Sequence, residues 1–185
     1  ISEVFQFDGA ENAEWNFLNF DTNSGELVSP MGTSGYRWQD EKGKWNLNFN
    51  DGETGKEYDP ALSLIDKYDE VLQVEFVEYG LNKKSNRGVP VRYIKTNTGE
   101  NVAVATIYDL TMAQYGIGRG LEGDYPDSYE DKGAAYTPAW QEIFTGIGSK
   151  TVLQFAREWA STAETTEGAC MVIVGAAINH WFHGN

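Results

Sequence analysis

Large apolar residues alternate with polar ones along the N-terminal half of the chain, which is the period of a half-buried β-strand. The stretches EWNFLNF (14–20) and GYRWQDEKGKWNLNF (35–49) carry this pattern. Turn sequences rich in Asp, Asn and Gly separate and follow them, DTNSGE and NDGETG, and such residues favour positive φ. The pattern from about Glu14 to Val77 therefore predicts an antiparallel meander or pair of hairpins, with a short helix at PALSLIDKYD (60–69).

The C-terminal half opens with a hairpin pattern. VPVRYIKT (89–96) and NVAVAT (101–106) predict two strands, joined by a turn that contains the Thr98–Gly99 pair. The polar, basic segment GLNKKSNRG (80–88), which is bounded by glycines, predicts a loop and the best internal boundary. We therefore expect a β-rich region over 1–80 and an α/β region over 81–185, together one incomplete domain of a larger subunit.

Three helices are predicted after the hairpin. TIYDLTMAQYG carries Thr106 as a cap and places Ile107, Leu110 and Tyr115 near one face. TPAWQEIFTG starts with Thr137 at the cap and a proline at the first helical position. SKTVLQFAREWASTAE is the strongest pattern, and its apolar face consists of Val152, Ala156, Trp159, Ala160 and Ala163. The segment between the first two helices (116–135) predicts a long loop.

The apolar run ACMVIVGAAI (169–178) completes the pattern. A short, continuously apolar segment is typical of a strand buried on both faces of a parallel sheet. The predicted fold class is α/β (α+β), in which an N-terminal antiparallel region precedes helices and a buried parallel-type strand. Ligands of open α/β sheets bind at the carboxyl ends of such strands.

Composition narrows the classes of partner. The net charge of −14 argues against nucleic acid and against an anionic membrane surface, and is typical of a well-solvated acidic surface. No apolar run approaches the ~20 residues that span a bilayer, so direct membrane insertion is not expected. The single cysteine, Cys170, excludes an internal disulfide and is expected to be a small buried residue. The start at Ile1, without methionine or an export signal, predicts an excised or processed piece.

Two motifs are better explained as turns. DTNSGELVSPMG resembles the start of a calcium loop, but its glycine comes one residue early and its twelfth position is Gly32 instead of Glu, so we favour a hairpin turn. GIGRG (116–120) follows a predicted helix, whereas a dinucleotide fingerprint must follow a strand. No pair of carboxylates stands out as a catalytic acid and base.

The segment GAAINHWFH contains both histidines of the chain at the exit of the predicted strand. Gly175 allows another group to approach the backbone closely, and Asn179 can both donate and accept hydrogen bonds. His180 and His183 share a side if the segment is helical, although two imidazoles without a third ligand predict zinc only weakly. A polar cluster that binds an anionic or heterocyclic ligand and a simple set of capped residues at a strand exit both remain open on these grounds.

Four longer segments, in this order, resemble the catalytic alpha subunit of membrane-bound respiratory nitrate reductases, in the molybdopterin oxidoreductase (dimethyl sulfoxide reductase) superfamily. They are TIYDLTMAQYGIGRGL, YTPAWQEIFTGI, VLQFAREWASTAETTEG and MVIVGAAINHWFH. Upstream, GYRWQDEKGKWNLNFNDGETGKE is similar to a further family segment, so the resemblance runs from about Trp15 to His183.

The resemblance implies a parent subunit that reduces nitrate to nitrite at a molybdenum bound by two molybdopterin guanine dinucleotides. It implies a 4Fe-4S cluster, an iron–sulfur beta subunit and a membrane cytochrome b gamma subunit that passes electrons from quinol, on the cytoplasmic side of the membrane in anaerobic respiration and nitrate assimilation. The family's metal and cluster ligands lie N-terminal to the matching region, so this chain is expected to be inactive alone and to bind no cofactor tightly. By this resemblance Gly175, Asn179 and His180 contact the pterin, with His183 as a companion.

Two alternatives remain beside this interpretation. A short, non-catalytic interaction module derived from the same domain would use the aromatic-rich, acidic surface to bind a protein or carbohydrate partner. A sister molybdenum reductase would act on chlorate, perchlorate or selenate, because the residues that select the substrate lie mostly outside this segment.

Overall fold

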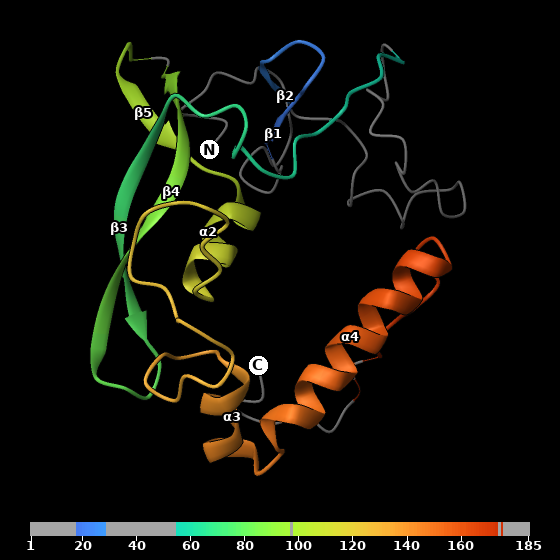
Figure 1. Cartoon of the computed structure of the whole chain (residues 1–185). Coiled ribbons are helices and arrows are strands. Elements are labelled where there is room, and N and C mark those ends of the chain that lie inside the picture. The colour runs from blue at the N-terminus through green and yellow to red at the C-terminus, as the bar shows by residue number, and fades with distance from the viewer. Residues whose placement is uncertain (1–17, 29–54, 97, 174, 176–185) are drawn as a thin grey trace. The chain divides into compact units, whose positions relative to one another are not determined.

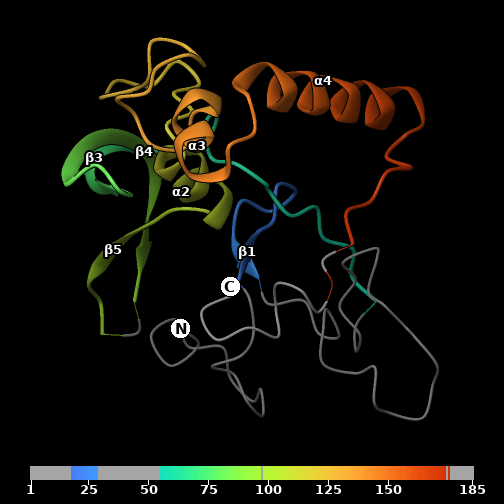
Figure 2. The ribbon, with the colours of Figure 1, turned by 90° about the horizontal axis from the view of Figure 1, so that it is seen from below.

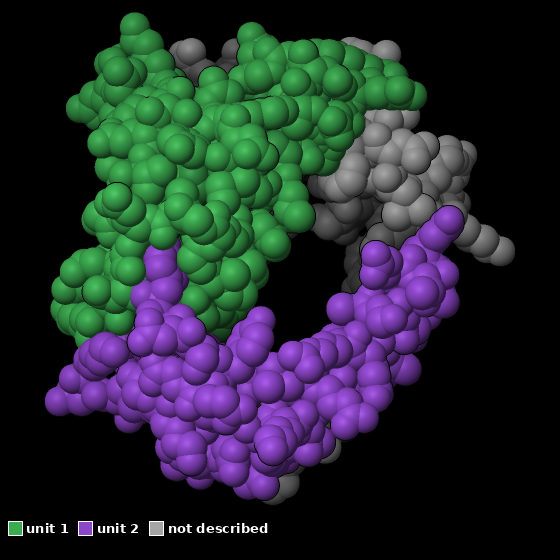
Figure 3. Space-filling view, viewed as in Figure 1, with its two compact units in different colours: residues 1–77, 84–124 green, residues 78–83, 125–185 purple. Residues whose placement is uncertain are grey.

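The computed structural model of the chain describes residues 18–28, 55–96, 98–173 and 175, and these form two compact units. Unit 1 comprises residues 1–77 and 84–124, and unit 2 comprises residues 78–83 and 125–185 (Figure 3). The described elements are three helices and two small sheets. The α+β class predicted from the sequence is confirmed.

A three-stranded sheet forms the body of unit 1 (Figure 1). Its strands are β3 (Glu70–Glu78), β4 (Lys83–Lys95) and β5 (Asn101–Val104), and β4 lies between the other two. β4 and β5 pair antiparallel from Arg92 opposite Val104 to Lys95 opposite Asn101. The turn between them needs Gly99, whose φ is +90°, so the predicted strand–turn–strand is confirmed.

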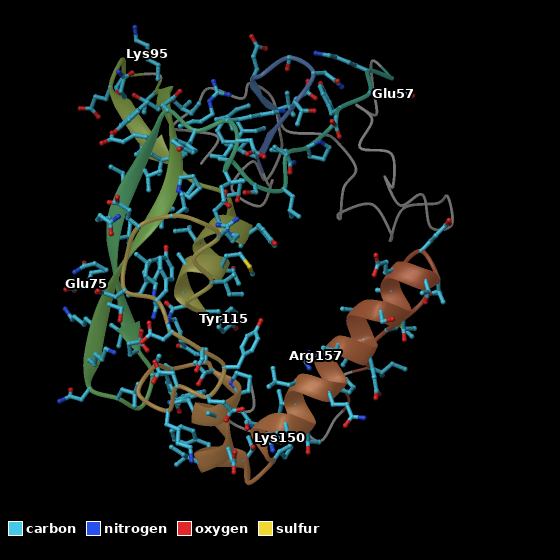
Figure 4. All side chains as sticks on the ribbon, in the orientation of Figure 1. Glu57, Glu75, Lys95, Tyr115, Lys150 and Arg157 are labelled. Carbon is cyan, nitrogen blue, oxygen red and sulfur yellow. The ribbon has the colours of Figure 1, made fainter. Side chains whose placement is uncertain are left out.

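Helix α2 (Ile107–Gln114) lies against one face of this sheet in both views (Figure 1 and Figure 2). Alternate residues of the strands point towards it, and the core consists of Val89, Val91 and Ala113, with Leu72, Val74, Phe76, Ala103 and Ala105 packed around them. The intervening residues of β3 face the other way, as the labelled Glu75 illustrates (Figure 4). This is the two-layer arrangement in which a half-buried sheet covers an apolar helix face.

The buried face of α2 differs from the predicted one. Ile107 is 71% exposed, and Leu110 and Tyr115 are exposed as well, whereas Asp109 and Ala113 are buried. The helix turns its small and charged residues inward because Ala113 fits closely against the sheet and Asp109 finds buried donors. Hydrophobic periodicity alone selects the opposite face.

Residues 83–88 belong to β4 and not to the predicted loop. They alternate as a strand does: Lys84 and Asn86 are exposed, whereas Ser85 and Arg87 are buried. The inward residues are polar, so a search for alternating hydrophobic residues does not detect this part of the strand. Arg87 is accommodated because carbonyl oxygens surround its guanidinium.

A two-stranded hairpin is described near the N-terminus, where β1 (Asn19–Phe20) pairs antiparallel with β2 (Leu27–Val28). Its turn is built on Asp21, whose carboxylate accepts from the N–H of Asn23, the N–H and hydroxyl of Ser24, and the N–H of Asp59. The hairpin turn predicted for this motif is therefore confirmed. The predicted strand over 35–49 lies outside the described residues.

The predicted helix over 60–69 does not form; only a turn at 65–67 is present. The backbone amides of this segment bond to other parts of the chain instead of to carbonyls four residues earlier. Ala61 N–H donates to Phe20 O at 2.7 Å, and Asp69 N–H donates to Val91 O at 2.9 Å. Residues 60–69 therefore form an irregular segment, called the strap below, whose conformation is set by hydrogen bonds to other parts of the chain.

Unit 2 contains the other two predicted helices, α3 (Pro138–Thr145) and α4 (Ser149–Thr165). Both are confirmed, including the Thr137 cap of α3, whose hydroxyl accepts from the N–H of Trp140 at 3.0 Å. Gly146 ends α3 at φ +71°, and the Glu142 carboxylate accepts from Ser149 N–H at the start of α4. The rings of Tyr79, Tyr136, Trp140 and Phe144 pack together beside α3.

The apolar run after α4 does not form the predicted strand in its described part. Residues 169–173 have no strand conformation, and Met171, Val172 and Ile173 are exposed, the last by 80%. A strand needs neighbours to accept and donate its backbone hydrogen bonds, and the described strands are all paired elsewhere. Residues 174 and 176–178 lie outside the described part of the chain.

Candidate functional site

Asp109 is a fully buried carboxylate in the first turn of α2. Four donors surround it: Ser63 Oγ and Arg119 Nη1 donate to Oδ1 at 2.6 and 2.8 Å, while Leu64 N–H and Thr106 Oγ1 donate to Oδ2, both at 2.8 Å. The Thr106 hydroxyl also accepts from the N–H of Asp109 and so caps the helix. The negative charge lies at the positive end of the helix dipole, where it is favoured.

Arg119 is the positive partner of Asp109 and comes from the loop after α2. It has a left-handed backbone, φ +50°, in a loop where Gly116 and Gly120 also have positive φ. Its Nη1 also donates to Ser63 Oγ at 3.2 Å, and its guanidinium lies 5.5 Å from the centre of the Tyr108 ring. The Nε of Arg119 is buried and has no hydrogen-bond partner among the described residues.

The pKa of Asp109 is lowered from its ordinary value by this environment. Burial is the largest single influence and raises the pKa, because it disfavours the charged form. The hydrogen bonds from Ser63, Leu64, Arg119 and Thr106 favour the carboxylate and together outweigh burial. Asp109 is therefore ionised at neutral pH.

Arg87 makes the corresponding contacts at the other end of α2. Its Nη1 donates to the carbonyls of Ala113 and Gln114, both at 3.0 Å, and its Nε donates to Asp124 O at 2.8 Å. The last turn of α2 contains no basic residue of its own, so β4 supplies the positive charge that this end favours. A charged side chain thus holds each end of the helix: Asp109 of the helix itself at the start, and Arg87 of β4 at the end.

This arrangement can position groups but cannot catalyse a proton transfer. All four donors to Asp109 are fixed, so its carboxylate has no accepting site left for a substrate proton. The Ser63 hydroxyl donates a hydrogen bond to this saturated carboxylate, and Arg119 Nη1 donates to its oxygen, so Ser63 is not arranged as an activated nucleophile. The described residues also contain no cluster of three or more His, Cys, Asp or Glu that could hold a metal.

The four predicted cofactor-binding residues are described only in part. Gly175 is exposed, and a Cβ built there would meet no atom within 4 Å. Asn179, His180 and His183 lie outside the described residues. Cys170 is half-buried instead of fully buried, with its thiol 3.9 Å from Trp159 O, because few atoms cover this part of the chain.

Sequence reasoning missed the Asp109–Arg119 pair, although a signal for it is present. Thr106 followed by Asp109 is a capping pattern, in which a side-chain oxygen at the cap is paired with an acidic residue three positions later. An arginine between glycines predicts a loop, but nothing local to it predicts a buried partner. The pairing depends on how the loop folds back.

The chain is similar to several curated nitrate reductase alpha chains. It is 44% identical over 184 residues to the respiratory nitrate reductase 1 alpha chain of Escherichia coli K12, which covers 93% of this chain. It is 38% identical over 174 residues to the nitrate reductase alpha chain of Bacillus subtilis 168 (93% of this chain), and 35% identical over 187 residues to the nitrate reductase alpha subunit of Mycobacterium tuberculosis H37Rv (95% of this chain).

The matched segment is 14% of the length of each of these three relatives. No family model matches the chain. None of the described helices is long and apolar enough to cross a bilayer. The resemblance to nitrate reductase alpha chains that the sequence indicates is confirmed.

Proposed function

We propose that this chain, which is similar to nitrate reductase alpha chains over nearly its whole length, is a segment of such a subunit and that the whole subunit reduces nitrate to nitrite. The observation that carries the proposal is the 44% identity over 184 residues to a respiratory nitrate reductase alpha chain. The match covers 93% of this chain, so the likeness is not confined to one short motif.

The molybdenum bis(molybdopterin guanine dinucleotide) cofactor and a 4Fe-4S cluster belong to this proposal for the whole subunit. The cofactor supplies the redox chemistry when bound. The described residues offer no metal ligand set, and Gly175 is the one predicted cofactor contact among them. Asn179 and His180 are proposed to hydrogen-bond the pterin, with His183 as a companion, while the segment alone is inactive.

The partner subunits are also proposed from the similarity to nitrate reductase alpha chains. Electrons would reach the subunit from an iron–sulfur beta subunit and a membrane cytochrome b gamma subunit, which would hold it at the cytoplasmic side of the membrane. The word "respiratory" in the names of three of the relatives supports an electron-transport role.

The described part of unit 1 is proposed to serve as scaffold in this subunit. Asp109 holds the start of α2 to residues 63 and 64 and to Arg119, and Arg87 of β4 holds the end of the helix to the sheet. Such a framework can hold neighbouring loops in place, because its charges are already satisfied and do not compete for ligands.

Sequencing the source gene through both ends of this segment tests the proposal first. A long reading frame with upstream His and Cys cluster ligands and an Asp-bearing metal loop would support it. A frame that closes at Ile1 and Asn185 would overturn it and favour a separate interaction module. Assays of the purified full-length subunit with nitrate, chlorate, perchlorate and selenate then identify the substrate.

Variants of the full-length subunit test the proposed cofactor contacts. Asn179→Ala and His180→Ala should lower molybdenum occupancy or nitrate reduction at least tenfold, because each removes a hydrogen bond to the pterin. Asn101→Ala, which alters an exposed residue at the start of β5, is the matched control and should leave both unchanged. Full occupancy and activity in Asn179→Ala and His180→Ala would contradict these contacts.

A further inference from the structure

Trp140 of α3 lies in a group of four aromatic rings, called the ring group below. Its ring centre is 4.7 Å from that of Phe144, 5.4 Å from that of Tyr136 and 6.0 Å from that of Tyr79. All four residues belong to unit 2, and Trp140 is only 9% exposed. The ring group therefore brings one indole and two phenols, each of which can lose a single electron, into contact.

The polar atoms of Trp140 and Tyr79 make no hydrogen bond within the described part of the chain. Trp140 Nε1 is buried and has no partner among the described residues. The Tyr79 hydroxyl likewise makes no hydrogen bond to a described residue. A buried N–H without an acceptor costs free energy, and a purely apolar ring would pack here without that cost. Packing alone therefore does not explain an indole and a phenol at these two positions.

Tyr136 holds its ring against Trp140 with an unfavourable backbone conformation. Its φ is +68°, in the left-handed region that a bulky residue rarely adopts. Neighbouring contacts maintain this conformation: Ala135 N–H donates to the buried Glu78 carboxylate at 2.6 Å, and the Thr137 hydroxyl caps α3. Glycine would adopt this backbone without strain, so the tyrosine at this position indicates a requirement for its side chain.

The surroundings of Trp140 make its oxidised form a strong oxidant. An indole that loses one electron becomes a radical cation, which normally releases its N–H proton to an acceptor and so becomes less oxidising. Trp140 Nε1 has no such acceptor among the described residues, so the radical cation keeps its proton. It then takes an electron from a phenol in contact with it, and the phenol loses its proton to water. The indole is restored, and a neutral tyrosyl radical is formed.

We propose that Tyr79 and Tyr136 protect Trp140 from oxidative damage by transferring electrons to it. The agents concerned are one-electron oxidants, which take a single electron from the indole. A small thiol in solution returns one electron and one proton to the tyrosyl radical and becomes a thiyl radical. The protection preserves the packing of α3, because Trp140 contacts the other three rings of the ring group. This redox activity goes beyond the proposed function and does not depend on it.

Residue-specific oxidation of the whole protein that contains this chain tests the protection. Azide radicals, generated by radiolysis of an azide buffer, are the one-electron oxidant and are reduced to azide anions. Peptide mass spectrometry measures the fraction of Trp140 that is converted to oxygenated products. In Tyr79→Phe/Tyr136→Phe both rings remain but neither phenol does, so oxidation of Trp140 should rise at least threefold. Tyr93→Phe, which removes a phenol of β4 outside the ring group, is the matched control and should leave it unchanged.

Returning a phenol to the ring group should restore the protection. Phe144→Tyr, added to the double variant, places a phenol on the ring that lies closest to Trp140 and should reverse most of the rise. Unchanged Trp140 oxidation in the double variant would overturn the proposal, as would a rise that Phe144→Tyr does not reverse. Faster amide hydrogen exchange of α3 in the double variant would also overturn it, because lost packing would then explain the damage. None of these measurements uses nitrate reduction, so the protection and the proposed function fail independently.

Discussion

Individual buried ions in this chain are satisfied mainly by backbone groups. The carboxylate of Asp21 accepts three backbone N–H groups, and the guanidinium of Arg87 donates to three carbonyl oxygens. Asp109 combines one backbone donor with two hydroxyls and a guanidinium. Since an unpaired buried charge is strongly destabilising, each of these residues fixes the local path of the chain.

Asp21 should titrate at unusually low pH. Its hydrogen bond from the N–H of Asp59, followed by that from the Ser24 hydroxyl, lowers its pKa from 3.8 to about 2. A carboxyl whose pKa is lower in the folded state stabilises the fold above its unfolded pKa, and this contribution is lost as the pH falls from near 4 towards 2. Following the Asp21 carboxyl carbon by NMR should give a midpoint near 2.

Loss of the Asp109 charge should loosen α2. In Asp109→Asn the amide nitrogen faces donors, so at least one buried hydrogen bond is lost, at a cost of about 1.5–3 kcal/mol for a charged pair. Amide hydrogen exchange of α2 should accelerate correspondingly. Asp66→Asn, at an exposed position of the preceding strap, is the control and should leave the exchange of α2 unchanged. Unaltered protection in Asp109→Asn would show that the pair does not hold the helix.

At the scale of elements, close approach and capping decide where the helices and loops lie. Residues Leu121–Asp124 run antiparallel beside β4: Gly88 N–H donates to Glu122 O at 2.9 Å, and Arg87 forms a β-bridge with Gly123. The helices begin at hydroxyl caps in α2 and α3. These contacts bring segments together that are distant in sequence.

Gly88→Ala should destabilise unit 1. The added Cβ would lie 2.9 Å from both Glu122 O and Val71 Cγ1, closer than such atoms pack, and overpacking of this kind typically costs about 1–3 kcal/mol. Hydrogen exchange of β4 amides should therefore accelerate. Gly148→Ala is the matched control, because a Cβ there meets nothing within 4 Å and the backbone φ is ordinary. A normal exchange profile for Gly88→Ala would contradict the close approach of residues 121–124 to Gly88.

The Thr137 cap should be needed for α3. Its hydroxyl accepts from Trp140 N–H and donates to Asp131 O at 2.6 Å, so Thr137→Ala should lower the free energy of unfolding of unit 2 by about 0.5–2 kcal/mol. Urea unfolding followed by tryptophan fluorescence measures this loss. Thr137→Ser keeps the hydroxyl and should recover most of the stability; equal losses in both variants would exclude the cap as the cause.

At the scale of the whole molecule, many large apolar side chains among the described residues are exposed. The exposed large apolar residues include Phe155 on α4, Ile143 and Phe144 on α3, and Met171, Val172 and Ile173 after α4. Scattered exposed apolar residues are normal, but a contiguous group usually marks an interface. The isolated chain is therefore expected to associate through such surface.

Light scattering of the isolated chain should detect this association. The apparent mass should rise with concentration above that of the 20.6 kDa monomer. Phe155→Gln should reduce the rise, and Arg157→Gln, on the polar side of α4, should not. A monodisperse monomer over a wide concentration range would contradict the expectation.

Local sequence determined the parts of this protein that depend on near neighbours. The helices capped by Thr106 and Thr137, the amphipathic α4, the Gly99 turn and the Asp21 hairpin turn were all predictable, because caps, turns and 3.6-residue periodicity act over a few residues. The sequence also indicated the family, since several long segments in fixed order are specific.

Tertiary structure alone decided which face of α2 is buried, that residues 83–88 form a strand, and that residues 60–69 form a strap. In each case polar groups find partners far along the chain: Asp109 with Ser63 and Arg119, and Arg87 with the end of α2. Hydrophobic patterns cannot reveal these partners, because a charged residue in the sequence is normally assigned to the surface. Only the position of its partner in the folded chain shows that it is buried. Residues 169–173 show the converse: their sequence favours a strand, but the strands that the structure describes are paired with one another and not with them.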